Sequence, residues 1–289
     1  MRPVSFEYHH AASLEQAVGL LAELGDEARP LAGGYSLVPM MNLRLARPAH
    51  LVDINNLGLD TIEQDGDVIR IGGLVRHVQV LNDPLIAAHL PLFPEAAHFI
   101  AHPTIRNRGS LGGSLAHADP TAELALLAVL HDATILAAST DGERRIPAGD
   151  FFKGAFTTAL EPGELVVGLE VPVAGNGYTG AFIELCERHG DFAIVAISVR
   201  LKVEDGIIAA ASLACAGAAS VPVRCGDAEE LLQGRSLDDP GASEAAEALT
   251  AAYDPPEDIR ATSEYRKDLI ASLTRQAVMA ACKRAEAAP

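Results

Sequence analysis

The sequence predicts an α+β fold in which two small α/β units precede a unit of antiparallel strands and helices. Three observations predict it. Short strand and helix patterns alternate up to about residue 171, and the order of these patterns changes after Gly58. A run rich in glycine and proline, Pro172 to Gly180, then marks a linker. Three strand-like runs and three alanine-rich helices follow it. We therefore expect a first domain over 1–175, made of subdomains 1–57 and 58–175, and a C-terminal domain over 176–289.

The first unit begins with an amphipathic helix. Ser13 is expected to cap this helix, with Gln16 at the capping-box position, and Gly25 is expected to end it. Its apolar residues recur at helical spacing between these two ends. The patterns then predict a strand over 28–31, a helix over 37–45 and a buried strand over 51–54.

The elements of the second unit are predicted from the alternation of apolar and polar residues and from the positions of proline and glycine. Pro120 is expected to open an apolar helix, because proline is tolerated in the first turn. Asp141-Gly142 predicts a turn. The expected elements are strands over 67–71, 133–138 and 164–171, and helices near 77–81, 93–100 and 121–130.

The C-terminal unit is predicted to contain a hairpin with its turn at Glu204-Asp205-Gly206. The expected strands cover 181–186, 193–203 and 207–216, and the expected helices lie near 228–232, 242–253 and 264–284.

Composition excludes several classes of function. The 289 residues are 49% hydrophobic and 21% charged, which is typical of a soluble globular protein. A formal charge of −17, 4% aromatic residues and no Trp argue against nucleic acid or an anionic membrane as partner. No apolar run is long enough for a membrane span, and the N-terminus lacks a signal-like segment, so we expect a cytoplasmic protein. The four scattered cysteines predict free thiols rather than disulfides or an iron–sulfur cluster.

Two glycine loops are the strongest functional signal. Ala32-Gly33-Gly34-Tyr35-Ser36 follows a predicted strand, and Gly109-Ser110-Leu111-Gly112-Gly113-Ser114 lies in the second unit. Glycines allow backbone N–H groups to converge on a phosphate oxygen. Taken alone, the first loop is more typical of an ordinary tight turn than of a phosphate site. Two such loops suit a ligand with two phosphates, although neither matches the Rossmann or Walker pattern.

Three motifs in order resemble one family. Residues 32–45 and 104–120 resemble the two FAD loops of the medium subunit in aerobic carbon monoxide dehydrogenases, and 188–193 resembles the motif that opens the C-terminal domain. The wider family comprises FAD-binding subunits of xanthine dehydrogenase-like molybdenum hydroxylases. The resemblance implies an FAD-binding domain of the p-cresol methylhydroxylase type. It also implies that non-covalent FAD is held by Ala32, Gly33, Gly34, Tyr35, Ser36, Ser110, Gly112, Gly113, Ser114 and Glu123.

Two positions depart from some relatives. Glu123 falls where xanthine dehydrogenases have Asp, beside the adenosine part of FAD. Ile183 falls where those enzymes have a flavin-proximal Lys, so we expect a different polarity around the flavin ring.

The implied function is electron relay. Substrate would be oxidised on a large molybdopterin-binding subunit, and electrons would pass from a small iron–sulfur subunit through FAD to an external acceptor, in a dimer of heterotrimers. A self-sufficient FAD-dependent oxidoreductase of the same fold is the alternative, but we find no convincing catalytic base. A non-enzymatic acidic binding module is a third hypothesis.

Other candidates have simpler interpretations. His117 and Asp119 resemble an acid–base pair, but helix entry is the expected role of Asp119. Arg106 and Arg108 are expected either on FAD phosphates or facing solvent or a partner, and Arg188 and Asp191 either near flavin or as an ion pair. We assign no catalytic residue, and no spacing places the remaining candidates for metal binding on one helical face with a carboxylate, so we expect no metal site. Those candidates are His9, His10, His98 and His102.

Overall fold

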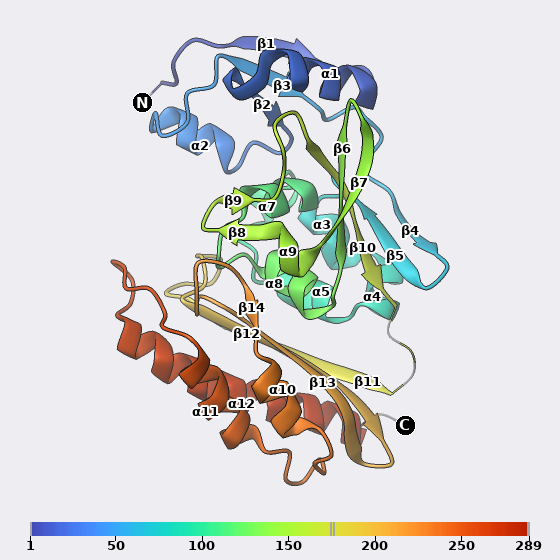
Figure 1. The fold of residues 1–289 in the computed structure, drawn as a ribbon, viewed down its shortest axis with the longest axis vertical. Coiled ribbons are helices and arrows are strands. Elements are labelled where there is room, and N and C mark those ends of the chain that lie inside the picture. Colours follow the sequence, from blue (N-terminus) through green and yellow to red (C-terminus); the bar gives the residue numbers. More distant parts are fainter. Residues whose placement is uncertain (1, 174, 176, 288–289) are drawn as a thin grey trace.

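The computed structural model describes residues 2–173, 175 and 177–287. Three sheets follow one another along the long axis of the molecule, in the order in which the chain forms them (Figure 1). The mixed helix and sheet architecture confirms the predicted α+β class. Within the described ranges, no helix has the length and apolar character needed to cross a membrane.

The first sheet is parallel and has the order β1-β3-β2. Its strands are β1 (Glu7–His10), β2 (Ala28–Leu31) and β3 (His50–Asp53). Helix α1 (Leu14–Leu24) has the predicted ends: Ser13 Oγ accepts from the Gln16 N–H at 3.2 Å, and Gly25 follows at φ 55°. The strand at 28–31 is confirmed. Helix α2 (Leu37–Asn42) is shorter than predicted, because Arg44 at φ 60° turns the chain away.

The second sheet is antiparallel, with the order β4-β5-β10-β6-β7. Its central strand is therefore the last of the five in the sequence. The strands are β4 (Ile62–Asp65), β5 (Val68–Gly72), β6 (Thr134–Ser139), β7 (Gly142–Pro147) and β10 (Leu165–Pro172). A small hairpin, β8 (Phe152–Gly154) and β9 (Thr157–Thr158), lies beside it.

Seven helices of the described chain belong to this middle unit. They are α3 (His77–Asn82), α4 (Pro84–His89), α5 (Leu92–Ala97), α6 (Pro103–Arg106), α7 (Leu111–His117), α8 (Glu123–Leu130) and α9 (Ala148–Phe151). The predicted helix at 93–100 ends three residues early. Helix α8 starts two residues later than predicted, because Asp119 accepts from the Thr121 N–H at 2.9 Å and holds a turn there.

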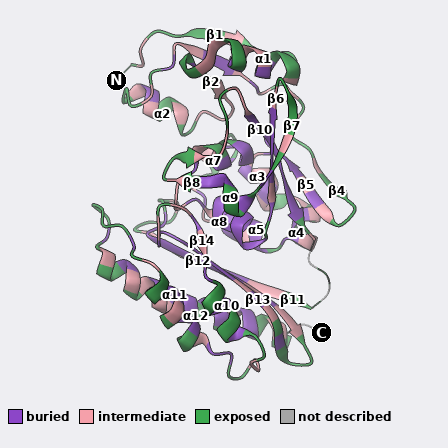
Figure 2. Ribbon diagram, in the orientation of Figure 1, coloured by how far each residue is buried: buried purple, intermediate pink, exposed green. Residues whose placement is uncertain are grey.

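Helix α8 is apolar all round because it lies between two sheets. Its residues Leu124 to Leu130 are all buried, and no face is polar (Figure 2). It contacts the third sheet through β12 and β13, and it shares a hydrophobic core with residues of the second sheet.

The third sheet is antiparallel, with the order β11-β12-β13-β14. It contains β11 (Tyr178–Leu185), β12 (Val195–Glu204), β13 (Ile207–Ala216) and β14 (Val223–Arg224). Helices α10 (Gly226–Leu232), α11 (Ala242–Ala252) and α12 (Ser263–Ala287) complete this part of the chain. The predicted turn at Asp205-Gly206 is confirmed, with φ values of 50° and 76°. The predicted linker, 172–180, includes residues 174 and 176, which lie outside the described residues.

Candidate functional site

A cavity of about 520 Å³ opens where the three parts of the chain meet. Its walls come from the segment after β2, from the chain between α5 and α8, and from the connection between β11 and β12. This volume is typical of a small-molecule or cofactor site, about 300–1,000 Å³. Nine of the ten predicted site residues line it: Ala32, Gly33, Gly34, Tyr35, Ser36, Ser110, Gly113, Ser114 and Glu123.

The first glycine loop offers free amide groups to this cavity. Within the described part of the chain, no protein acceptor takes the backbone N–H groups of Gly33, Gly34, Tyr35 or Ser36. Gly34 adopts φ +77°, where a side chain would be strained. Successive free N–H groups in a turn form an anion-binding concavity, so this loop suits a phosphate oxygen.

The second glycine segment differs from the predicted loop, because its latter half is helix α7. Ser110 begins this helix, and its Oγ accepts from the Gly113 N–H at 3.3 Å. The Gly112 N–H donates to Gly73 O at 2.8 Å, so it is not available to a ligand, and Gly112 does not line the cavity. Gly113 is exposed and faces the cavity. The two neighbouring glycines therefore have different roles.

The two glycine segments touch through their backbones. A Cβ atom added at Gly33 would lie 2.1 Å from Arg108 O, which no repacking of side chains can relieve. Likewise, a Cβ atom at Gly112 would lie 2.7 Å from Gly73 O. Gly33 and Gly112 thus allow close packing of the chain, whereas a Cβ atom at Gly113 would meet only Ser110 Oγ, at 2.8 Å.

Asn55 and Arg76 tie the two segments together. Asn55 Nδ2 donates to the carbonyl oxygens of Leu31 and Ala32, at 3.2 and 3.1 Å. The guanidinium of Arg76 donates to Asn55 Oδ1 at 2.6 Å and to Arg108 O at 2.8 Å. Burial lowers the pKa of Arg76 from its ordinary value. No local sequence pattern marks these two residues, because their partners lie 21 to 32 positions away.

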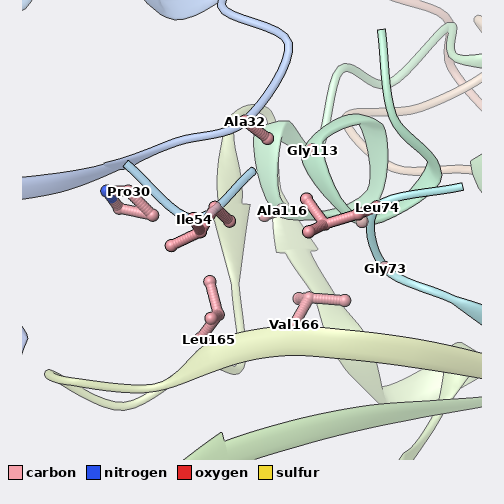
Figure 3. A pocket seen from close by; sticks show the side chains of 10 residues that line it. Pro30, Ala32, Ile54, Gly73, Leu74, Gly113, Ala116, Leu165 and Val166 are labelled. Carbon is pink, nitrogen blue, oxygen red and sulfur yellow. The ribbon is translucent and has the colours of Figure 1, made fainter. Parts of the chain in front are cut away.

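A small apolar cavity of about 40 Å³ lies beneath the loops (Figure 3). The side chains of Ile54, Leu74, Leu165 and Val166 surround it below Ala32 and Gly113. The loops therefore rest on a largely hydrophobic floor shared by the first and second sheets.

Two buried carboxyl groups influence each other here, Glu123 at the cavity wall and Glu184 outside the lining. Burial raises the pKa of Glu123, which lines the cavity, to about 7. Burial and the neighbouring Glu123 raise the pKa of Glu184 to about 8, and in the described part of the chain neither carboxylate oxygen of Glu184 has a hydrogen-bond partner. Sequence reasoning missed Glu184 and considered its neighbour Ile183 instead. Ile183 packs against the core of the third sheet and its helices, away from the cavity.

The third wall comes from the predicted motif at 188–193. Gly190, Asp191 and Phe192 line the cavity, whereas Arg188 does not. Gly190 has φ +90°, and a Cβ atom there would lie 2.9 Å from Ala101 O, so the connection packs directly on the middle unit. No ion pair joins Arg188 to Asp191 in the described chain. Because Arg188 does not line the cavity, Asp191 is the charged residue that this motif places at the site.

His117 and Asp119 both line the cavity, but they are differently engaged. The His117 ring packs beside Phe156 at 5.0 Å, and burial lowers the pKa of His117. Asp119 accepts from the N–H and the hydroxyl of Thr121, at 2.9 and 2.8 Å. Asp119 therefore does not cap helix α8 as predicted, because the helix begins at Glu123 and its N-cap residue, Ala122, makes no side-chain cap; Asp119 instead holds the turn before the helix. Phe156 was not recognised from the sequence, because a single exposed aromatic in a loop carries no pattern.

The expectation for Arg106 is wrong. Arg106 is buried, and its Nη1 donates to the carbonyl oxygens of Ile100 and Ala101 at 2.8 Å, so it faces neither a ligand nor solvent. Arg108 is exposed, and its side chain does not line the cavity.

Comparisons with known proteins agree with this geometry. The family described as the FAD binding domain in molybdopterin dehydrogenase matches residues 4–174, and the CO dehydrogenase flavoprotein C-terminal domain matches 180–281. The chain is 41% identical to the 6-hydroxypseudooxynicotine dehydrogenase complex subunit alpha of Paenarthrobacter nicotinovorans, over 99% of this chain and 97% of that protein. It is 38% identical to the carbon monoxide dehydrogenase medium chain of Afipia carboxidovorans, over 99% and 100%. A solved carbon monoxide dehydrogenase from Hydrogenophaga pseudoflava superposes with a TM-score of 0.95 at 36% identity, covering 98% of this chain and 99% of that one.

Proposed function

Because the chain belongs to the family of FAD-binding medium subunits of xanthine dehydrogenase and carbon monoxide dehydrogenase, we propose that it relays electrons from a partner's iron–sulfur clusters to an external acceptor. FAD is its cofactor, and the chain is a flavoprotein subunit of a molybdenum hydroxylase. The observation that carries the proposal is the cavity with a row of free N–H groups on one wall.

The residues present fit FAD. We assign the pyrophosphate to the free N–H groups of residues 33–36 and to the open face of Gly113 opposite them. The hydroxyl groups of Ser36, Ser110 and Ser114 supply further donors at the cavity wall. Glu123 is assigned to the adenosine part, where a carboxyl group accepts from a ribose hydroxyl. We do not assign Gly112 to the direct FAD contacts that the resemblance implied. Its N–H donates to Gly73 O, so we assign it to the packing of the chain.

The chain's own residues position and shield the cofactor. When bound, FAD exchanges electrons singly or in pairs, which connects one-electron clusters to a two-electron acceptor. The Asn55–Arg76 pair fixes the spacing of the two glycine segments before the ligand arrives. Such preorganisation lowers the ordering cost of binding. Phe156 and Phe192 contribute exposed apolar surface at the cavity, which bound FAD would cover.

Partner subunits are part of the proposal. All four cysteines are free thiols, and none belongs to a cluster of potential metal ligands in the described chain. The clusters and the molybdenum cofactor are therefore assigned to a small and a large subunit, in a dimer of heterotrimers. Reduced thiols also support a cytoplasmic location. We retain the division into domains at 1–175 and 176–289, with subdomains at 1–57 and 58–175, as part of this proposal.

Reconstitution tests the relay. The FAD-loaded chain alone should show no turnover with purines, N-heterocycles, aldehydes or carbon monoxide, yet its chemically reduced form should pass electrons to an artificial dye. Co-expression with the large and small subunits should give substrate-dependent dye reduction. Substrate-dependent bleaching of the flavin in the lone chain would instead favour a self-sufficient oxidoreductase. Acid or heat should release FAD, and release of FMN or retention of flavin on denatured protein would contradict non-covalent FAD binding.

A further inference from the structure

Strands β1 and β3 bring two histidines and a glutamate onto one face of the first sheet. The strands are parallel, and their register places Glu7 beside His50 and His9 beside Val52. Residues two apart in a strand point to the same face, so Glu7 and His9 both lie on the face that carries His50. The neighbouring residues point the other way and have their own partners: Tyr8 donates to Asp53, and His10 bonds Asn56 at 2.8 Å.

The ligand atoms of these three side chains converge. His9 Nε2 lies 3.0 Å from His50 Nδ1, and Glu7 Oε2 lies 3.7 Å from the same nitrogen. All three atoms lie within 4.8 Å of one another. A tetrahedral ion with bonds of 2.0–2.1 Å separates its ligand atoms by about 3.4 Å, a value between the two measured distances. The exposed Glu7 side chain can rotate towards the ion, and the two rings turn from their mutual hydrogen bond so that both lone pairs face it.

We propose that Glu7, His9 and His50 form a binding site for a divalent transition metal ion. Two imidazoles and one carboxylate select Zn²⁺, Cu²⁺ or Ni²⁺ over Mg²⁺ and Ca²⁺, which prefer oxygen ligands alone. The fourth position is open to water or to a partner's side chain, because the Glu7 side chain is 75% exposed. A formal charge of −17 on the chain favours approach of a cation.

This site is separate from the FAD cavity. None of its three residues lines that cavity. The sequence showed no such site, because His50 comes from a strand 41 residues beyond His9 and the parallel pairing supplies the proximity. The expectation that this chain has no metal site rested on the spacing of nearby residues, which gives no information on two histidines that strand pairing brings together.

In the metal-free state, one imidazole N–H donates to the other ring nitrogen. Binding replaces this bond with two metal–nitrogen bonds, and each ring then presents its lone pair to the ion. The two states differ in their nitrogen ligation, which electron paramagnetic resonance of bound Cu²⁺ detects directly.

The test uses the FAD-loaded full-length chain with no affinity tag. Titration with Zn²⁺ and Cu²⁺ should show one tight site per chain, and the Cu²⁺ spectrum should show coupling to two imidazole nitrogens. His9→Ala and His50→Ala should each leave one coupled nitrogen and weaken binding more than about tenfold, since even loss of an outer-shell partner can cost that much. Glu7→Gln, at an exposed position, should weaken binding without affecting the fold. Excess Mg²⁺ should not compete.

Two matched controls separate this site from other histidines. His10→Ala removes the next side chain of the same strand, and His98→Ala removes one ring of the His98–His189 pair, whose centroids are 5.6 Å apart. Both should leave affinity and the two-nitrogen spectrum unchanged. The proposal is overturned if no stoichiometric site is found, if His50→Ala binds as tightly as wild type, or if His10→Ala or His98→Ala removes the site. FAD content, read from the visible spectrum, should be the same in all variants.

Discussion

Arg76 donates a 2.6 Å hydrogen bond to Asn55, and this bond links the two glycine segments that line the cavity. Asn55 holds the carbonyl groups of the first segment, and Arg76 holds Arg108 O in the second. Neither residue lines the cavity, so both act through the backbone that they position.

We expect Arg76→Ala to weaken FAD binding and to destabilise the apo chain by about 1.5–3 kcal/mol, the range for hydrogen bonds to charged groups. Isothermal titration with FAD and urea unfolding measure the two effects. Arg76→Lys should recover part of the stability but little of the affinity, because one ammonium cannot span both acceptors at the same angles. Arg70→Ala, in an exposed pair with Glu143, is the matched control and should change stability by less than about 1 kcal/mol. Equal FAD affinity in Arg76→Ala and wild type would reject the positioning role.

Substitutions at Gly33, Gly112 and Gly113 should have different effects on the stability of the apo chain and on FAD affinity. Gly113→Ala places a methyl group in the cavity and displaces Ser110 Oγ, the cap of this helix, but it also relieves the helix cost of glycine, so the two effects oppose each other and the stability of the apo chain should change by less than about 1 kcal/mol. FAD affinity should nevertheless fall by roughly tenfold or more, about 1.4 kcal/mol. Gly112→Ala should instead destabilise the apo chain by about 1–3 kcal/mol, since its Cβ atom meets Gly73 backbone.

Gly33→Ala should behave like Gly112→Ala, because its Cβ atom would meet Arg108 O. Flavin absorbance and unfolding by urea are measured on the same samples. If Gly113→Val retained full FAD occupancy, the assignment of the pyrophosphate to this part of the cavity would fail.

The buried carboxyl groups predict the pH dependence of apo stability. The pKa of Glu123 is raised to about 7 and that of Glu184 to about 8, so the folded chain binds more protons than the unfolded chain between pH 4.5 and these values. The contribution of both groups to the free energy of unfolding therefore decreases as pH rises through this window. The charge of Asp119 acts in the same direction on Glu123, because it raises the pKa of that carboxyl group further.

Glu184→Gln should reduce this decrease and make the apo chain more stable than wild type at pH 8. Urea unfolding at pH 6, 7 and 8 measures the slope. Glu143→Gln, at an exposed position of β7, should leave the slope as in wild type. A Glu184→Gln slope equal to that of wild type would show that Glu184 ionises freely in the folded chain.

Local patterns predicted those elements whose stabilisation is local. The Ser13 cap and Gly25 lie within one helix, and Asp205-Gly206 forms its own turn. Strand β1 was not predicted, because its side chains are mostly exposed and pairing with β3 holds it in place. Helix α7 was not predicted, because two glycines near its start cost about 1 kcal/mol each. Its backbone is held by a hydrogen bond to Gly73, which is 39 positions earlier in the sequence.

The residues of the candidate site also fall into two groups, those that the sequence predicted and those that it did not. Glycine loops can be recognised from their composition alone. Of the ten site residues that the family resemblance implied, nine line one cavity. Asn55, Arg76 and Glu184 carry no such mark, because polar residues of these types are common on surfaces. Their roles depend on partners in other elements, such as Arg108 O for Arg76 and Glu123 for Glu184.

The position of β10 has a consequence for how the chain is made. A ribosome releases the hairpins β4–β5 and β6–β7 well before β10, yet β10 pairs with β5 on one side and β6 on the other. Until Pro172 has emerged, both hairpins carry an inner edge with unpaired backbone groups, and such edges invite pairing with other nascent chains. The chain is therefore expected to be most prone to pairing with other nascent chains between the release of Pro147 and the release of Pro172.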